Sequence, residues 1–157
     1  MGSEVVELDR KDREILTLLQ EDASLPMADV AARVGLSPSP CWRRVRRMEE
    51  AGVIKGRVAL VDRSKVGPSL TAYAFISLER HEDNVIDQFH EAIRSAPEVT
   101  TCAAVTGAVD FFLTVVVPDM EAYERFLRQR LLGLTMIRSI NTSFMLREVK
   151  SSTAVPL

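Results

Sequence analysis

Apolar residues in the first third of the chain recur at helical spacing in two successive stretches. From Leu8 to about Asp22, leucine and isoleucine side chains share one face, and Asp9 is suited to cap the start of that helix. Met27 to Val34 repeats the pattern over a shorter length. The sequence therefore predicts two helices in the first 34 residues.

Residues 37–52 form a third helical stretch. Ser37 is a suitable N-cap, Pro38 fits the first helical position, and Gly52 is suited to end the helix. One apolar stripe follows the spacing i, i+4, i+7, and its members are Cys41, Val45 and Met48. At about 100° per residue, the opposite side is basic. It carries Arg43, Arg46 and Arg47, with Arg44 beside the apolar stripe.

The basic face of this third helix allows two interpretations. Arginines on an amphipathic helix often face water, here paired with Glu49 and Glu50. Alternatively, the planar guanidinium fork fits DNA phosphates and guanine edges. The turn Gly35-Leu36-Ser37 before this helix favours DNA, because a short helix, a glycine turn and a capped second helix form a helix-turn-helix.

The hydrophobic pattern changes after this motif. Residues 53–61 are short, apolar and β-prone, and we expect a strand that could also pair with a second subunit. Residues 62–68 are typical of a turn and include Gly67-Pro68. We interpret this segment as a domain boundary.

The rest of the chain alternates between strand and helix patterns. Strands are predicted over 70–78, 99–106, 111–117 and 137–149, and helices over 83–95 and 119–132. This β-α-β-β-α-β order is the ferredoxin-like plan, so the whole chain is predicted to be α+β. Two helices can cover only one face of four strands, whereas strand 70–78 is apolar on both faces. We therefore expect the second face to be buried by sheet-to-sheet dimerisation.

Composition places few limits on function. The net charge of −2 gives no global attraction to nucleic acid, so any DNA contact has to come from a local basic patch. Cys41 and Cys102 show no metal-ligand spacing, and there is no long apolar run. We expect a reduced, cytoplasmic protein with no membrane segment, no metal and no cofactor. His81 and His90 belong to no catalytic pattern, so we expect no catalytic residues and no enzyme activity.

Several short signatures occur together in one order. They are Leu8-Asp9, Val34-Gly35-Leu36-Ser37-Pro38, Cys41, Arg44-Val45, Glu49, Gly52, Gly107-x-x-Asp110, Val117-Pro118-Asp119 and Glu148-Val149-Lys150. In this combination the chain resembles the Lrp/AsnC family of transcriptional regulators over about residues 8–150. The resemblance implies a winged-type helix-turn-helix domain over 1–52, a β linker over 53–68, a ferredoxin-like effector-binding and oligomerisation domain over 69–150, and a tail over 151–157.

The resemblance also implies partners. It implies binding to double-stranded promoter DNA through the third helix, and by position the DNA-binding candidates are Ser37, Ser39, Arg43, Arg44 and Arg47. Arg44 flanks the apolar stripe, so it suits a backbone contact or a structural ion pair. The resemblance implies a homodimer that assembles further into a tetramer or octamer, and a small effector, usually an amino acid.

A loop between two predicted strands is the candidate effector site. Glycine in Thr106-Gly107 lets backbone amides approach a carboxylate, and Asp110 could hold an α-ammonium group. The residues alone favour an ordinary hairpin with an aspartate bonded to its own turn. The resemblance favours a ligand site and adds Thr142 and Phe144 from the last strand.

Two alternatives from other classes remain open at this point. Some proteins of this overall shape are haem-pathway decarboxylases, which would make the chain an enzyme. A DNA-compacting protein that needs no effector would use the same basic helix.

Overall fold

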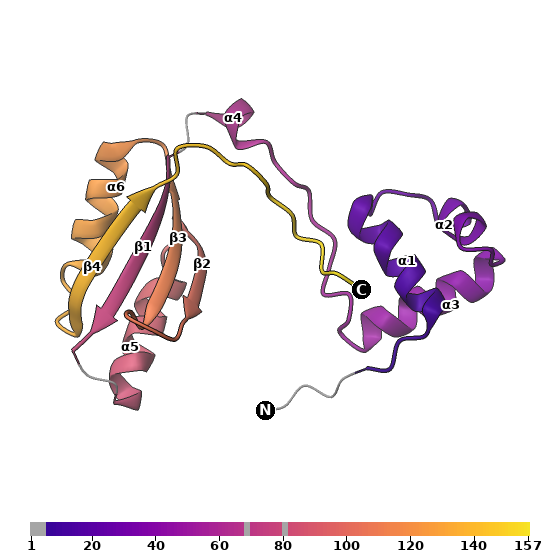
Figure 1. The fold of residues 1–157 in the computed structure, drawn as a ribbon, viewed down its shortest axis with the longest axis horizontal. Coiled ribbons are helices and arrows are strands. Elements are labelled where there is room, and N and C mark those ends of the chain that lie inside the picture. Colours follow the sequence, from indigo (N-terminus) through magenta and orange to yellow (C-terminus); the bar gives the residue numbers. More distant parts are fainter. Residues whose placement is uncertain (1–5, 68–69, 80–81) are drawn as a thin grey trace. The chain divides into compact units, whose positions relative to one another are not determined.

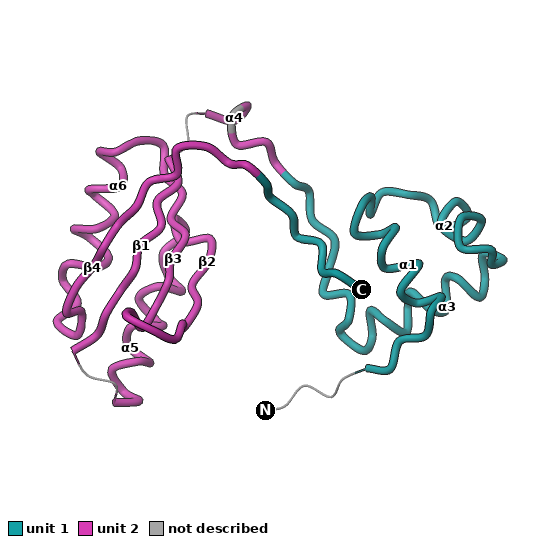
Figure 2. Tube along the Cα trace, viewed as in Figure 1, with its two compact units in different colours: residues 1–60, 150–157 teal, residues 61–149 magenta. Residues whose placement is uncertain are grey.

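The computed structural model describes residues 6–67, 70–79 and 82–157. The chain forms two compact units, one containing residues up to Leu60 together with 150–157, and the other residues 61–149 (Figure 2). The chain thus leaves the first unit once and returns to it. Pro68 in the predicted boundary and His81 lie outside the described residues.

The first unit is built from α1 (Arg10–Glu21), α2 (Met27–Arg33) and α3 (Pro38–Glu50) (Figure 1). Their apolar faces meet in one core, whose fully buried side chains include Ile15 from α1 and Val30 from α2. The predicted stripe of α3 is part of this core: Cys41, Val45 and Met48 are at most 2% exposed. The turn between α2 and α3 depends on Gly35, whose φ of 66° suits a residue without a Cβ.

The starts of α1 and α3 differ in how they are capped. Asp9 and Asp12 form a reciprocal capping box at α1, so the predicted cap is confirmed. Ser37 is the N-cap residue of α3, but its hydroxyl does not cap the helix. Its carbonyl accepts the Cys41 N–H at 3.3 Å, and Pro38 removes one amide that would otherwise need a partner.

The strand predicted over residues 53–61 is not formed. These residues run without regular secondary structure, and a short helix α4 (Arg63–Val66) follows. A strand needs a neighbouring strand to satisfy its backbone groups, and the described part of the chain pairs none with this segment. Val58 and Leu60 are consequently 82% and 80% exposed.

The second unit is a four-stranded antiparallel sheet in the order β2-β3-β1-β4 with helices on one face (Figure 1). Its strands are β1 (Leu70–Leu78), β2 (Val99–Ala104), β3 (Phe111–Val117) and β4 (Ile137–Phe144). The covering helices are α5 (Asp83–Arg94), α6 (Met120–Phe126) and a π-helical turn η1 (Leu127–Leu131). The α+β class and the ferredoxin-like order are therefore as predicted.

Two strands are shorter than the sequence pattern indicates. The predicted continuation of β4 to Val149 does not occur, because its neighbour β1 begins at Leu70 and the last bond joins the Met145 N–H to the Thr71 carbonyl at 2.9 Å. Similarly, β2 ends at Ala104, opposite Phe111 of β3, and the chain then turns. In both places the partner strand sets the boundary.

The two faces of the sheet are unequal. On the helix-covered face, Ala74, Ile76 and Leu113 are fully buried. On the open face, Tyr73 and Phe112 stack with ring centroids 5.7 Å apart, and Phe75 lies 5.5 Å from Phe112. These aromatic side chains are only half-buried, as expected for the face that was predicted to meet another sheet. No helix in the described residues is long and apolar enough to cross a membrane.

Candidate functional site

The outer face of α3 presents the residues that were predicted to contact DNA. Ser37, Ser39 and Arg43 are exposed at or near the start of the helix. Arg43 makes no ion pair within the described part of the chain. An unpaired guanidinium on a rigid helix can bind a phosphate or a base edge without first breaking an internal contact.

Arg44 and Arg47 instead turn toward α1. Arg44 donates to Asp9 Oδ2 at 2.6 Å and to Asp12 Oδ1 at 2.9 Å. Arg47 donates to Asp12 Oδ2, which also accepts the Asp9 backbone N–H at 3.1 Å. The predicted flanking position of Arg44 thus corresponds to an ion pair. Arg47 was expected to point outward. Its side chain is half-exposed, but its guanidinium group is paired with Asp12.

The centre of this arrangement is the carboxylate of Asp12, which is fully buried. A buried charge is costly unless it is paired and hydrogen-bonded, and here each oxygen accepts from a guanidinium of α3. Asp12 therefore ties α1 to the basic helix. The sequence interpretation missed it, although its signal was present: Asp9-x-x-Asp12 has capping-box spacing, which places Asp12 in the first turn of α1.

A shallow hollow of about 310 Å³ lies where these residues meet. It is lined by Asp9, Pro40, Arg43, Arg44 and Arg47. Three guanidinium groups beside two carboxylates leave a local positive excess in a chain whose net charge is −2. This is the local basic patch that DNA binding requires.

Arg46 and Trp42 occupy the far side of α3. Arg46 lies 3.5 Å from Glu50 and its guanidinium is 5.7 Å from the centre of the Trp42 ring. Arg46 therefore faces water and pairs with nearby acidic side chains, which is the first of the two interpretations of the basic face. Trp42 is 53% exposed, so its ring lies on the surface of the helix and is not part of the core.

In the second unit, the predicted effector loop joins β2 to β3. Thr106 and Gly107 are exposed, and Gly107 has a φ of 119°, which a side chain would strain. The Asp110 carboxylate accepts the Leu78 N–H at 2.7 Å, and the Asp110 N–H donates to the Ile76 carbonyl at 2.9 Å. Asp110 therefore bonds to the neighbouring strand β1, beyond its own turn.

Thr142 and Phe144, the predicted effector residues of β4, face the helices. The Thr142 hydroxyl lies 2.6 Å from that of Tyr123 in α6, and the Phe144 ring meets the Tyr123 ring edge-on at 5.2 Å. Burial raises the pKa of Tyr123, against a smaller lowering by the bond to Thr142. Tyr123 was not identified from the sequence, where it is one of several apolar residues on its helix.

The chain by itself keeps the two halves of the predicted effector site apart. Thr106, Gly107 and Asp110 lie at the β2–β3 connection, whereas Thr142 and Phe144 lie on β4, and β1 separates β3 from β4 in the sheet (Figure 1). A ligand touching both groups would need a further surface, such as a second chain.

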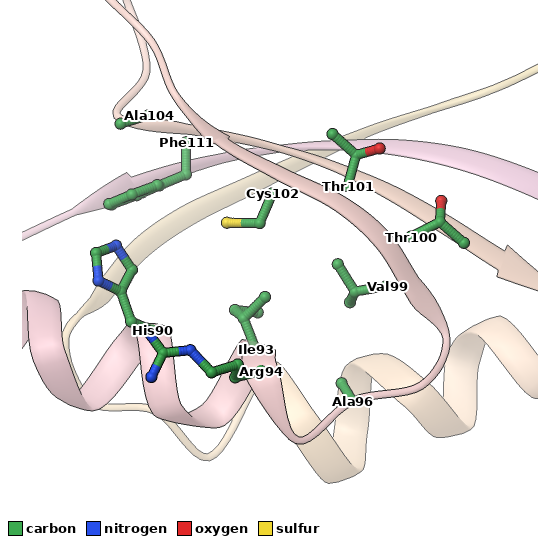
Figure 3. Close-up of a pocket in the computed structure, with 10 residues that line it drawn as sticks. All are labelled: His90, Ile93, Arg94, Ala96, Val99, Thr100, Thr101, Cys102, Ala104 and Phe111. Carbon is green, nitrogen blue, oxygen red and sulfur yellow. The ribbon is translucent and has the colours of Figure 1, made fainter. Parts of the chain in front are cut away.

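A separate hollow of about 410 Å³ lies between α5 and β2. Figure 3 shows His90 and Arg94 on α5 and Cys102 on β2 lining it. The thiol of Cys102 is exposed, and partial desolvation by its neighbours raises its pKa above the ordinary value. Among the described residues, no group of three histidine, cysteine or acidic side chains could hold a metal ion.

Two family models match successive parts of the chain. Residues 8–55 match a winged helix-turn-helix DNA-binding model. Residues 71–155 match the Lrp/AsnC ligand binding domain. Each match covers one of the two candidate sites described above.

Full-length relatives align over nearly the whole chain. The leucine-responsive regulatory proteins of Escherichia coli and Klebsiella pneumoniae are each 40% identical over 146 residues, which cover 93% of this chain and 89% of theirs.

Solved structures give the same result. An AsnC family transcriptional regulator from Agrobacterium tumefaciens has a TM-score of 0.90 at 42% identity, covering 95% of this chain and 97% of its own. A transcriptional regulator from Neisseria meningitidis, solved as a complex with L-Met, has a TM-score of 0.90 at 35% identity, covering 96% and 97%.

The Asp12→Asn substitution is predicted to destabilise the first unit. It leaves Arg44 and Arg47 without their shared anion, so the free energy of unfolding should fall by about 2–3 kcal/mol, less than for a fully buried pair because both arginines are partly exposed. Urea unfolding measures this loss. Glu50→Gln, which removes an exposed charge paired with Arg46, should change stability by less than about 0.5 kcal/mol. Equal effects of the two substitutions would contradict the anchoring role of Asp12.

A second prediction concerns acid. The Asp12 backbone N–H and then the Arg44 guanidinium lower the pKa of Asp9 below its ordinary value. A carboxyl whose folded-state pKa is depressed contributes stability above its unfolded pKa of about 3.9, and loses it as pH falls through the folded-state value. The wild type should therefore lose more stability than Asp9→Asn between neutral pH and about pH 3. Parallel losses in urea unfolding would show that Asp9 makes no such contribution.

Proposed function

The chain belongs to the Lrp/AsnC family of transcriptional regulators, with a DNA-binding helix-turn-helix and a ligand-binding domain; from this premise we propose that it binds promoter DNA through α3 and responds to an amino acid. This proposal depends mainly on the basic hollow at α1 and α3, where one arginine has no ion pair among the described residues and two are held in place. A regulator of promoters acts where chromosomal DNA is, so its place is the cytoplasm.

The three arginines of the hollow have different roles in this proposal. Arg43 contacts DNA directly, because no internal partner holds it among the described residues. Arg44 is a positioning residue that sets the angle of α3 on α1. Arg47 is shared, since DNA phosphates would compete with Asp12 for its half-exposed guanidinium. Ser37 and Ser39 are placed to donate to phosphate near the helix start.

The proposed effector is an amino acid. A related regulator from Neisseria meningitidis binds L-Met, and its fold matches this one closely. Here the exposed loop at Gly107 can direct backbone amides toward a carboxylate, and Asp110 supplies an anion for the ammonium group. Thr142 and Phe144 belong to a second surface, so the complete site would lie between chains.

Assembly follows from the same surfaces. We expect a homodimer through the open face of the sheet, where Tyr73, Phe75 and Phe112 form an aromatic cluster. We expect further association of this dimer into a tetramer or octamer. Duplicated helix-turn-helix units raise DNA affinity beyond that of one copy.

We also propose that the chain has no enzyme activity. Its relatives are transcriptional regulators. Mixing the protein with haem and recording the visible absorption spectrum tests the decarboxylase alternative, since a shifted haem band would support that class. A footprint spread over DNA without preferred sites would instead support the compaction alternative.

Arg43→Ala is predicted to weaken promoter binding by about 1–3 kcal/mol if Arg43 contacts a base. The measurement is fluorescence anisotropy with a duplex from a bound promoter and with a random duplex. Arg46→Ala is the matched control, because Arg46 lies on the same helix but pairs with Glu49 and Glu50. An equal loss on both duplexes would restrict Arg43 to phosphate contact, and no loss would remove it from the interface.

Asp110→Asn is predicted to weaken amino-acid binding by at least tenfold, because it removes the negative charge offered to the ammonium group. Calorimetry with the twenty amino acids on the wild type first identifies the effector, and the best one is then titrated into the variant. Asp119→Asn is the control, since asparagine also caps α6. No heat and no change in assembly with any amino acid would contradict the effector proposal.

A further inference from the structure

The helix-turn-helix unit carries a second hollow, a mostly apolar groove that contains none of the residues of the basic hollow. It has a volume of about 540 Å³, and its walls come from Leu16 and Leu19 of α1 and from residues 53–60. The third wall is formed by residues 150–157, which we call the return segment because the chain comes back to this unit there (Figure 1).

The return segment closes one side of the groove as an extended peptide. Thr153, Val155 and Leu157 line the cavity. Alternate residues share one face only in an extended chain, so the spacing of two identifies a strand-like segment with one side turned inward. Val155 and Leu157 remain 63% and 48% exposed, so the segment is held without being enclosed.

A single side chain fixes the register of this peptide. The Gln20 amide donates to the Val155 carbonyl at 3.1 Å, and its oxygen accepts the Val155 N–H at 2.6 Å. A carboxamide paired with both backbone groups of one residue supplies the two bonds that a neighbouring strand would supply. Recognition therefore depends on an extended backbone, with the apolar wall selecting alternate side chains.

Helix α1 connects this groove to the basic face. Its last turn carries Gln20, and its first turn carries Asp12, which holds Arg44 and Arg47. A constraint on one end of a 12-residue helix is transmitted to the other, because the helix moves as a rigid element. The return segment also follows β4, the strand that carries Thr142 and Phe144.

We propose that the apolar surface formed by α1 and residues 53–60 is a peptide-docking site whose occupant is the return segment of the same chain, and that its occupancy raises the affinity of α3 for DNA. The DNA part rests on the function proposed above, whereas the docking part does not. Filling the groove restrains α1 and so keeps Asp12 and its two arginines in the arrangement that α3 needs. Release of the segment from its open groove would loosen that arrangement.

Hydrogen exchange on the full chain tests the docking. The Val155 amide should be protected in the wild type, and Gln20→Ala should speed its exchange about fivefold, the effect of losing one hydrogen bond of ordinary strength. Thr17→Ala changes an exposed residue one turn earlier on α1 and should leave it unchanged. A Val155 amide that exchanges at the rate of a free peptide in the wild type would overturn the proposal.

A second variant acts on the peptide side and leaves the sequence of α1 unchanged. Val155→Pro removes the N–H that Gln20 accepts. Promoter affinity should fall about fivefold, the lower end of usual coupling between sites. If Val155→Pro and Gln20→Ala both bind the promoter as tightly as the wild type does, the proposed coupling is wrong. If the wild type itself binds no DNA, the proposed function is wrong instead.

Cross-linking assigns the occupant. With Cys102→Ser as background and Cys41 buried, Ala23→Cys and Thr153→Cys place two thiols on the groove. A short thiol-reactive cross-linker should give, by mass spectrometry under denaturing conditions, a product of one chain plus one linker in which both thiols are consumed. A product of two chains would show that a second copy supplies the segment and would overturn the same-chain assignment.

Discussion

The paired carboxylate of Asp12 is the interaction on which the DNA-binding unit depends. It is fully buried, yet both oxygens accept from guanidinium groups of α3. Without those arginines its burial would be costly, and without the carboxylate two positive side chains would repel each other beside the core. The same contact therefore packs α1 on α3 and limits which arginines are available for DNA. A helix that looks uniformly basic in sequence has one arginine, Arg43, without an ion pair among the described residues, and three whose guanidinium groups are already engaged.

Much of the fold was predictable because periodic patterns report burial directly. Strands β1 and β3 were located to the residue, because β1 alternates along its length and β3 is a short apolar run that Pro118 ends. Boundaries that depend on a partner were not predictable: β4 stops early because β1 gives it no neighbour, and the segment 53–61 forms no strand for the same reason. The hydrophobic pattern of one strand does not show where the neighbouring strand in the sheet ends.

The candidate sites were predictable to a smaller extent. The stripe of α3 and the position of its arginines followed from helical geometry, and Arg44 was expected to allow an ion pair. Asp12 was missed because a buried acid is recognised only when its partners, more than thirty positions away, are known. The predicted effector residues lie in two groups on different strands, and a sequence does not show which of them meet across chains. Asp110 illustrates the difficulty, since its carboxylate bonds to β1.

The double connection between the two units has a consequence for synthesis. Because residues 61–149 are inserted between two parts of the first unit, that unit contains both early and late parts of the chain. On the ribosome, α1, α2 and α3 emerge first and can pack at once, since their core is local in sequence. Their groove stays empty until residue 155 has left the exit tunnel. A nascent chain would thus carry a basic helix on a loosened α1 until residues 150–157, which are translated after the second unit, complete it.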